Sequence, residues 1–144
     1  MGTRALTFVY DGETPIINLY RQYDGYPTGH GAELAQFLDG FKIVNGLGPA
    51  SPSRIANGMG CLAAQLVSHF KGDEAGQFYL YSPQTVECGQ DYEYHVYQKD
   101  KELRVAVTNR GCNFFGLTMS DTNEGIFDGT VAEFAKFCFD ESYA

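Results

Sequence analysis

Two neighbouring segments with apolar residues at every second position constrain the fold most. Residues 91–98 alternate tyrosine and valine with polar side chains, and residues 102–108 do the same with leucine and valine. A period of two is typical of a strand with one buried face. The turn-forming residues 99–101 separate the two segments, so the sequence predicts an antiparallel hairpin.

The remaining pattern predicts an α+β fold in a single domain, residues 1–144. We expect a largely antiparallel sheet of about five to six strands, with two to three helices packed on one face. The predicted order is ββα–loop–αββββα. The predicted elements besides the first hairpin are a hairpin over 5–23, strands at 78–81 and 113–119, and helices at 32–41, 61–70 and 131–138. A loop follows residue 119, and Asp128 and Thr130 are the N-cap candidates of the last helix.

Composition and charge exclude several classes of protein. The hydrophobic content of 44% is too high for a disordered chain, and the net charge of −8 without a basic cluster argues against binding long nucleic acid. No apolar segment approaches the roughly 20 residues that span a bilayer, so we expect no membrane partner and a cytoplasmic location. The 10 tyrosines suit half-buried surfaces and interfaces, and we expect a homo-oligomer, a dimer or larger.

The cysteines and histidines do not form a recognisable metal or cofactor site. Cys61, Cys88, Cys112 and Cys138 are spaced too widely for a zinc template, and we interpret them as free thiols. The three histidines have no carboxylate at ligand spacing. We therefore predict no metal and no cofactor.

The candidate binding residues lie in two glycine-rich turns, each followed by a predicted helix. The first turn, residues 20–31, supplies Arg21, Asp24, Tyr26, Gly29, His30 and Gly31. The second, residues 54–60, supplies Arg54, Asn57, Gly58 and Gly60. A helix N-terminus presents unpaired N–H groups with partial positive charge, and glycine lets an anion approach the backbone.

These residues predict a non-enzymatic binding module for a small anionic ligand, such as a nucleotide or a phosphate compound. The two turns would form one pocket if they met in space. The structural alternative is ordinary turn chemistry, with Arg21 pairing with Asp24 or capping a helix. His30 favours the functional interpretation, because a side chain between two glycines gains little from core packing.

Two other functions remain open. One is a protein–protein interaction or assembly module, suggested by the acidic charge and the tyrosine-rich strands. The other is a small hydrolase that uses His30 with Asp24 or with Cys61, which stands at a predicted helix N-terminus where a thiol pKa falls.

Three pieces of the sequence, residues 21–31, 57–67 and 92–96, resemble a group of short uncharacterised phage and bacterial proteins. The resemblance covers about a third of the chain and implies a phage-type or marine microbial origin, with expression in a bacterial cytoplasm. It implies no activity that could be assigned to particular residues. Small phage proteins that trap nucleotide signals offer only an analogy.

Overall fold

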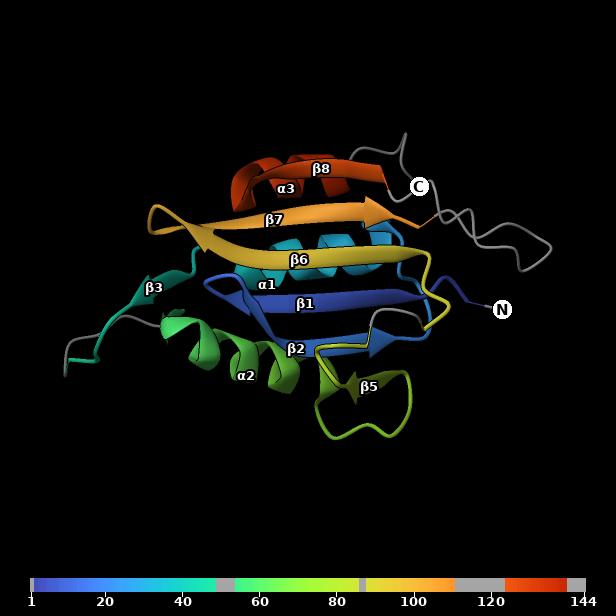
Figure 1. The fold of residues 1–144 in the computed structure, drawn as a ribbon, viewed down its shortest axis with the longest axis horizontal. Coiled ribbons are helices and arrows are strands. Elements are labelled where there is room, and N and C mark those ends of the chain that lie inside the picture. The colour runs from blue at the N-terminus through green and yellow to red at the C-terminus, as the bar shows by residue number, and fades with distance from the viewer. Residues whose placement is uncertain (1, 49–53, 86–87, 111–123, 140–144) are drawn as a thin grey trace.

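The protein is a six-stranded sheet covered on one face by helices (Figure 1). The computed structural model describes residues 2–48, 54–85, 88–110 and 124–139. In chain order the elements are β1 (Ala5–Asp11), β2 (Thr14–Arg21), the π-helical turn η1 (Pro27–Gly31), α1 (Ala32–Leu38), β3 (Lys42–Val44), β4 (Ile55–Asn57), α2 (Gly58–Lys71), β5 (Phe78–Tyr81), β6 (Tyr92–Lys99), β7 (Glu102–Asn109), β8 (Glu124–Thr130) and α3 (Val131–Cys138).

The sheet joins two antiparallel units through one parallel pair of strands. Its order is β5-β2-β1-β6-β7-β8, and both predicted hairpins, β1–β2 and β6–β7, are present. The parallel pair is β1 with β6, in the register Ala5 opposite Tyr92 to Val9 opposite Val96. The sequence did not predict this pairing, because alternation reports which face of a strand is buried and not which strand lies beside it.

One face of the sheet is packed against α1, α2 and α3, as the sequence predicts for an α+β fold. Side chains from β1, β6 and β7 on this face share a core with the helices, whose buried residues include Leu34, Leu62 and Phe134. The opposite face carries no helix of the described chain, and we call it the open face. No helix in the described ranges has the length and apolar character needed to cross a membrane.

The structure differs from the sequence prediction in three local features. The irregular stretch 45–60 contains β4, which pairs in parallel with β3 to form a small second sheet. The sixth strand of the large sheet, β8, occupies residues predicted as loop, while the predicted strand 113–119 lies outside the described residues. Helix α1 ends at Leu38 instead of Phe41, because Gly40 turns the chain with a φ of 75°.

Of the two N-cap candidates for α3, the structure selects Thr130. Its hydroxyl accepts a hydrogen bond from the backbone N–H of Glu133 at 3.2 Å, and the Glu133 carboxylate accepts one from the backbone N–H of Thr130 at 2.9 Å. This reciprocal capping box satisfies two N–H groups that the helix leaves without partners. Asp128 lies on β8 instead, where its carboxylate accepts a hydrogen bond from the Tyr97 hydroxyl.

We therefore expect Thr130→Ala to lower the free energy of unfolding by about 1 kcal/mol, the usual effect of removing a cap. Asp128→Ala, at the rejected cap position, is the matched control and should cost less, since its only described partners are the exposed Tyr97 and Arg104 pairs. Urea unfolding of both variants measures the difference. An equal or larger loss in Asp128→Ala would contradict the assignment.

Candidate functional site

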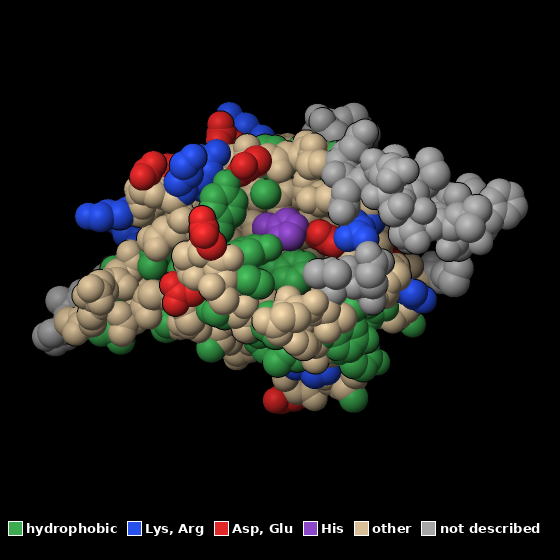
Figure 2. Space-filling view, in the orientation of Figure 1, with side chains coloured by type: hydrophobic (Ala, Val, Ile, Leu, Met, Phe, Trp, Pro, Cys, Tyr) green, Lys and Arg blue, Asp and Glu red, His purple; other side chains and the backbone are tan. Residues whose placement is uncertain are grey.

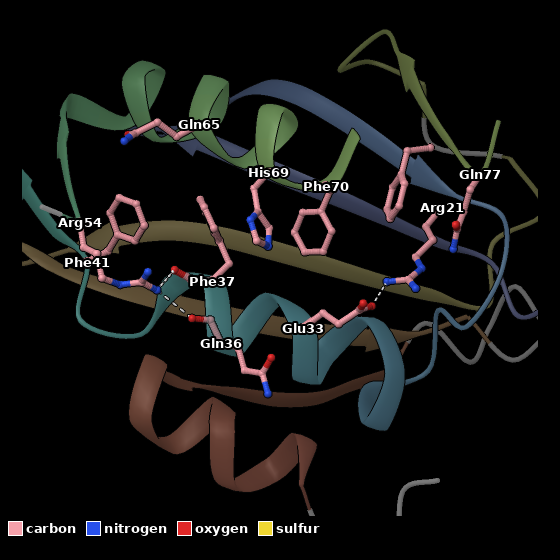
Figure 3. A pocket seen from close by; sticks show the side chains of 11 residues that line it. Arg21, Glu33, Gln36, Phe37, Phe41, Arg54, Gln65, His69, Phe70 and Gln77 are labelled. Carbon is pink, nitrogen blue, oxygen red and sulfur yellow. Dashed lines mark hydrogen bonds and ion pairs between the residues drawn. The ribbon is translucent and has the colours of Figure 1, made fainter. Parts of the chain in front are cut away.

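A cleft lies between α1 and α2 on the helix side of the sheet (Figure 3). Its volume is about 480 Å³, within the size range of small-molecule sites, about 300–1,000 Å³. Arg21 lies at one end of the cleft and Arg54 at the other. The lining residues are Arg21, Glu33, Gln36, Phe37, Phe41, Arg54, Gln65, His69, Phe70, Gln77 and Phe78. The fold thus brings both predicted arginines to one concavity.

Arg21 is the best-anchored polar residue of the cleft. It is 6% exposed, and its guanidinium lies over the ring of Phe78 at 5.1 Å. Its Nε donates to the carbonyl of Tyr23 at 2.6 Å, while Nη1 faces His30 and forms an ion pair with Glu33. The side chain of Glu33 is 51% exposed, so a buried cation meets an exposed anion at this end of the cleft.

His30 lies behind Arg21 in the core, with no exposed surface. Arg21 Nη1 donates to His30 Nδ1 at 3.2 Å, which leaves the ring proton on Nε2 to donate to the hydroxyl of Thr7 at 2.7 Å. The ring also packs against Phe70 and Tyr94, with both centroid distances 5.0 Å. The idea that His30 gains little from packing is therefore wrong. With both nitrogens engaged, it is not placed to accept a proton from a substrate.

Burial, and next the charge of Arg21, lower the pKa of His30 from 6.5 to about 3. Between these values the unfolded chain binds a proton at this residue that the folded protein does not, so stability falls as the pH falls. We expect the free energy of unfolding to decrease between pH 6 and pH 5 by up to about 1.4 kcal/mol per pH unit. Urea titrations across this range measure the slope.

The matched variant is His30→Gln, whose amide can accept from Arg21 and donate to Thr7 without titrating. It should flatten the slope between pH 6 and pH 5, whatever its effect on absolute stability. The pKa values of the Glu93 and Glu133 carboxyl groups are lowered in the folded protein. Their protonation therefore decreases the free energy of unfolding chiefly below about pH 4.5, outside this window. An unchanged slope in the variant would contradict the assignment.

Arg54 closes the other end of the cleft by capping α1. Its Nε donates to the carbonyl of Asp39 at 2.7 Å, and Nη2 donates to the carbonyls of Gln36 and Phe37 at 2.9 and 2.7 Å. The guanidinium also lies 5.4 Å from the centre of the Phe41 ring. The last carbonyls of a helix carry partial negative charge, so this cation is partly neutralised but fixed in position.

A smaller hollow of about 380 Å³ adjoins the cleft and shares Arg21, Glu33 and Gln36 with it. It contains three further predicted residues: Asp24, Tyr26 and Gly29. The Tyr26 hydroxyl donates to the Asp24 carboxylate at 3.2 Å, and this partner raises the tyrosine pKa. The ion pair between Arg21 and Glu33 therefore belongs to the walls of both hollows.

The glycines of the first turn allow close packing of the chain against itself. A Cβ on Gly31 would lie 2.7 Å from the sulfur of Cys138, and one on Gly29 would lie 2.5 Å from the carbonyl oxygen of Asp24. Both distances are too short for real contacts. The close approach of these neighbouring atoms therefore accounts for glycine at both positions without a ligand.

Three predicted residues of the second turn lie outside both hollows. Asn57 uses its side-chain oxygen to accept from the backbone N–H of Gly46 at 2.7 Å, and Gly58 begins α2 with a φ of 84°. Gly60 is exposed on the first turn of that helix. The sulfur of Cys61 donates to Gln65 on its own helix at 3.4 Å. The structure therefore places Arg54 in the wall of the cleft, whereas Asn57, Gly58 and Gly60 lie outside it.

Sequence reasoning missed most of the apolar and amide lining of the cleft. In the sequence, Phe37 and Phe41 belong to the apolar stripe of an ordinary amphipathic helix, and His69 is predicted to be a packing or surface residue. The available signal was the pair Glu33 and Gln36, polar positions one turn apart on a largely apolar helix. No three residues among the His, Cys, Asp and Glu of the described ranges group as metal ligands.

Comparisons with known proteins identify no family for this chain. No family model matches it, and neither the curated proteins nor the solved structures contain a match.

Proposed function

We propose that this protein is a binding module for a small anionic ligand with a planar ring, such as a nucleotide, held in the cleft between α1 and α2. The observation that carries the proposal is that Arg21 and Arg54, distant in sequence, lie at the two ends of one cleft of about 480 Å³. Arginine binds phosphate and carboxylate groups through a planar fork of N–H donors.

Arg21 supports the proposal because it is preorganised. Hydrogen bonds to Tyr23 and His30 hold the guanidinium in place, and burial restricts the other conformations that the side chain could adopt. The carboxylate of Glu33 stands at the position where a ligand anion would pair with the same guanidinium. A ligand phosphate would displace the exposed Glu33 carboxylate toward water. It would then pair with a guanidinium that is already held in position.

The walls between the two arginines fit a planar ring. The rings of Phe37 and His69 are stacked with centroids 4.7 Å apart, and Phe41 lies 5.0 Å from Phe37. Aromatic faces bind flat heterocycles by stacking. Glutamines from α1, α2 and the segment before β5 add amide groups that can both donate and accept hydrogen bonds, as a nucleobase edge requires.

The proposal predicts that Glu33→Gln strengthens binding of AMP, because it removes the anion that competes for Arg21. An exposed ion pair contributes up to about 1 kcal/mol, so the dissociation constant should fall roughly two- to fivefold. Isothermal titration calorimetry with AMP and with inorganic phosphate measures this change. The Arg21→Ala variant is unsuitable, since it would leave His30 with an unpaired buried nitrogen.

Glu13→Gln is the matched control, because it changes the net charge equally at the exposed turn between β1 and β2. It should leave AMP binding within twofold of the parent protein. Equal effects of both substitutions would show that the change in AMP affinity comes from net charge and not from the position of Glu33. Absence of AMP and phosphate binding in all three proteins at millimolar concentration would overturn the proposal.

A second candidate function, assembly with other copies or proteins, is favoured by the exposed edge strand β5. Tyr79, Leu80 and Tyr81 are 47%, 60% and 39% exposed, and β5 is the terminal strand of the sheet. The free edge of such a strand can pair with another chain, and exposed tyrosines are typical of interfaces.

If β5 mediates assembly, Leu80→Lys should shift sedimentation velocity toward smaller species. Leu47→Lys is the control: Leu47 is 64% exposed but follows β3, which lies at the left of Figure 1 and apart from β5 at the lower edge of the sheet. A parent protein that sediments as a monomer at all concentrations would contradict assembly and leave the cleft proposal unaffected.

A further inference from the structure

A second polar cluster lies on the open face, on the other side of the sheet from the cleft. Tyr10 of β1 and His95 of β6 approach each other because β1 and β6 pair in parallel, with Phe8 opposite His95. The Tyr10 hydroxyl lies 2.7 Å from His95 Nδ1, and His95 Nε2 lies 3.4 Å from a carboxylate oxygen of Glu93. In Figure 2, histidine, acidic and basic side chains meet near the centre of this face.

The surrounding residues fix the orientation of this chain of groups. The second oxygen of Glu93 accepts from Arg110 Nη1 and from Gln90 Nε2, both at 2.8 Å. The Phe8 ring stacks on the imidazole of His95 with a centroid distance of 5.3 Å and an angle of 5°. With Glu93 accepting at Nε2, the neutral imidazole carries its proton there and accepts from Tyr10 at Nδ1.

This order of groups is that of an activated nucleophile, in which a hydroxyl contacts a base and the base contacts a carboxylate that orients it. We propose that Tyr10 is a nucleophile that attacks uncharged carboxylic esters, with His95 as its general base and Glu93 as the residue that positions His95. The site is separate from the cleft and its activity does not depend on ligand binding there. Tyr10 is half-buried and the side chain of His95 is 22% exposed, so both reach the surface.

The charges of the cluster support this assignment of roles. Burial, and next the charge of Glu93, raise the pKa of Tyr10, so a free phenolate is disfavoured and the proton must leave as the new bond forms. Burial alone would raise the pKa of Glu93. Hydrogen bonds with His95 and Gln90, and next the charges of His95 and Arg110, outweigh it and lower the net value, so the carboxylate is ionised at neutral pH. An ionised Glu93 stabilises the imidazolium that forms on His95.

The reaction balances without a further reagent. Tyr10 Oη bonds to the ester carbonyl carbon, its proton passes to His95 Nδ1, and the alcohol leaves with that proton to give an acyl-tyrosine. Water then attacks the aryl ester and gives a proton to His95, which returns it to the Tyr10 oxygen as the acid departs. An uncharged ester suits the site, because Glu93 and Arg110 compensate each other and the chain as a whole has a net charge of −8.

The test uses p-nitrophenyl acetate with the full-length protein at pH 8. Release of nitrophenolate is followed optically, and the acetylated residue is located by peptide mass spectrometry. We expect Tyr10 to be acetylated at least about tenfold faster than Tyr79 and Tyr81, which are more exposed but have no histidine partner among the described residues. Release should continue beyond one equivalent, since the acyl-tyrosine is hydrolysed.

Two variants separate a chemical role from a structural one. His95→Gln keeps a polar group beside Tyr10 but removes the base, and should slow Tyr10 acetylation by roughly 100-fold with an unchanged melting temperature. Tyr10→Phe should abolish turnover. Acetylation of Tyr10 no faster than that of Tyr79, an unchanged rate in His95→Gln, or release that stops at one equivalent would each overturn the proposal.

Discussion

The parallel pairing of β1 with β6 is the interaction on which the rest of the structure depends. It joins the β2–β1 half of the sheet to the β6–β7–β8 half, so no continuous sheet exists without it. Residues 5–9 of β1 are buried on both faces, as expected for a central strand. Each face of this pair carries one polar network, and the fold must satisfy both because buried polar groups without partners are costly.

The two networks differ in the chemical group at which each of them ends. On the helix side, Thr7, His30 and Arg21 form a buried chain that ends at Glu33 in the cleft, the carboxylate that the proposed ligand would replace. On the open face, Glu93 is held by two donors and the chain ends at the hydroxyl of Tyr10. The first arrangement favours binding, since the cation of Arg21 is held in place behind the exposed Glu33 carboxylate. The second favours proton transfer, since its free end is a hydroxyl on a base.

Much of the fold was predictable from local pattern. Hairpins 5–23 and 91–108 and the α3 helix follow from alternation, turn residues and an amphipathic stripe, which are properties of neighbours in sequence. Residues 54–60 show the limit: β4 pairs with β3, and Arg54 donates to the carbonyl of Asp39, the residue that follows the end of α1 at Leu38. Arg21 and Arg54 were identified as candidates, but their partners were not, because these come from other elements.

The sequence by itself determined the three helices and the strands of both hairpins, which of their faces are apolar, and that Arg21, Arg54 and the glycine-rich run 20–31 are unusual. Only the tertiary structure decided what these residues do. It buried His30, gave Gly31 a packing role against Cys138, and placed both arginines in one cleft. It also brought Tyr10 to His95 across 85 positions of the chain. The physical reason is that periodicity reports burial, whereas partner choice depends on strand order, which no local pattern encodes.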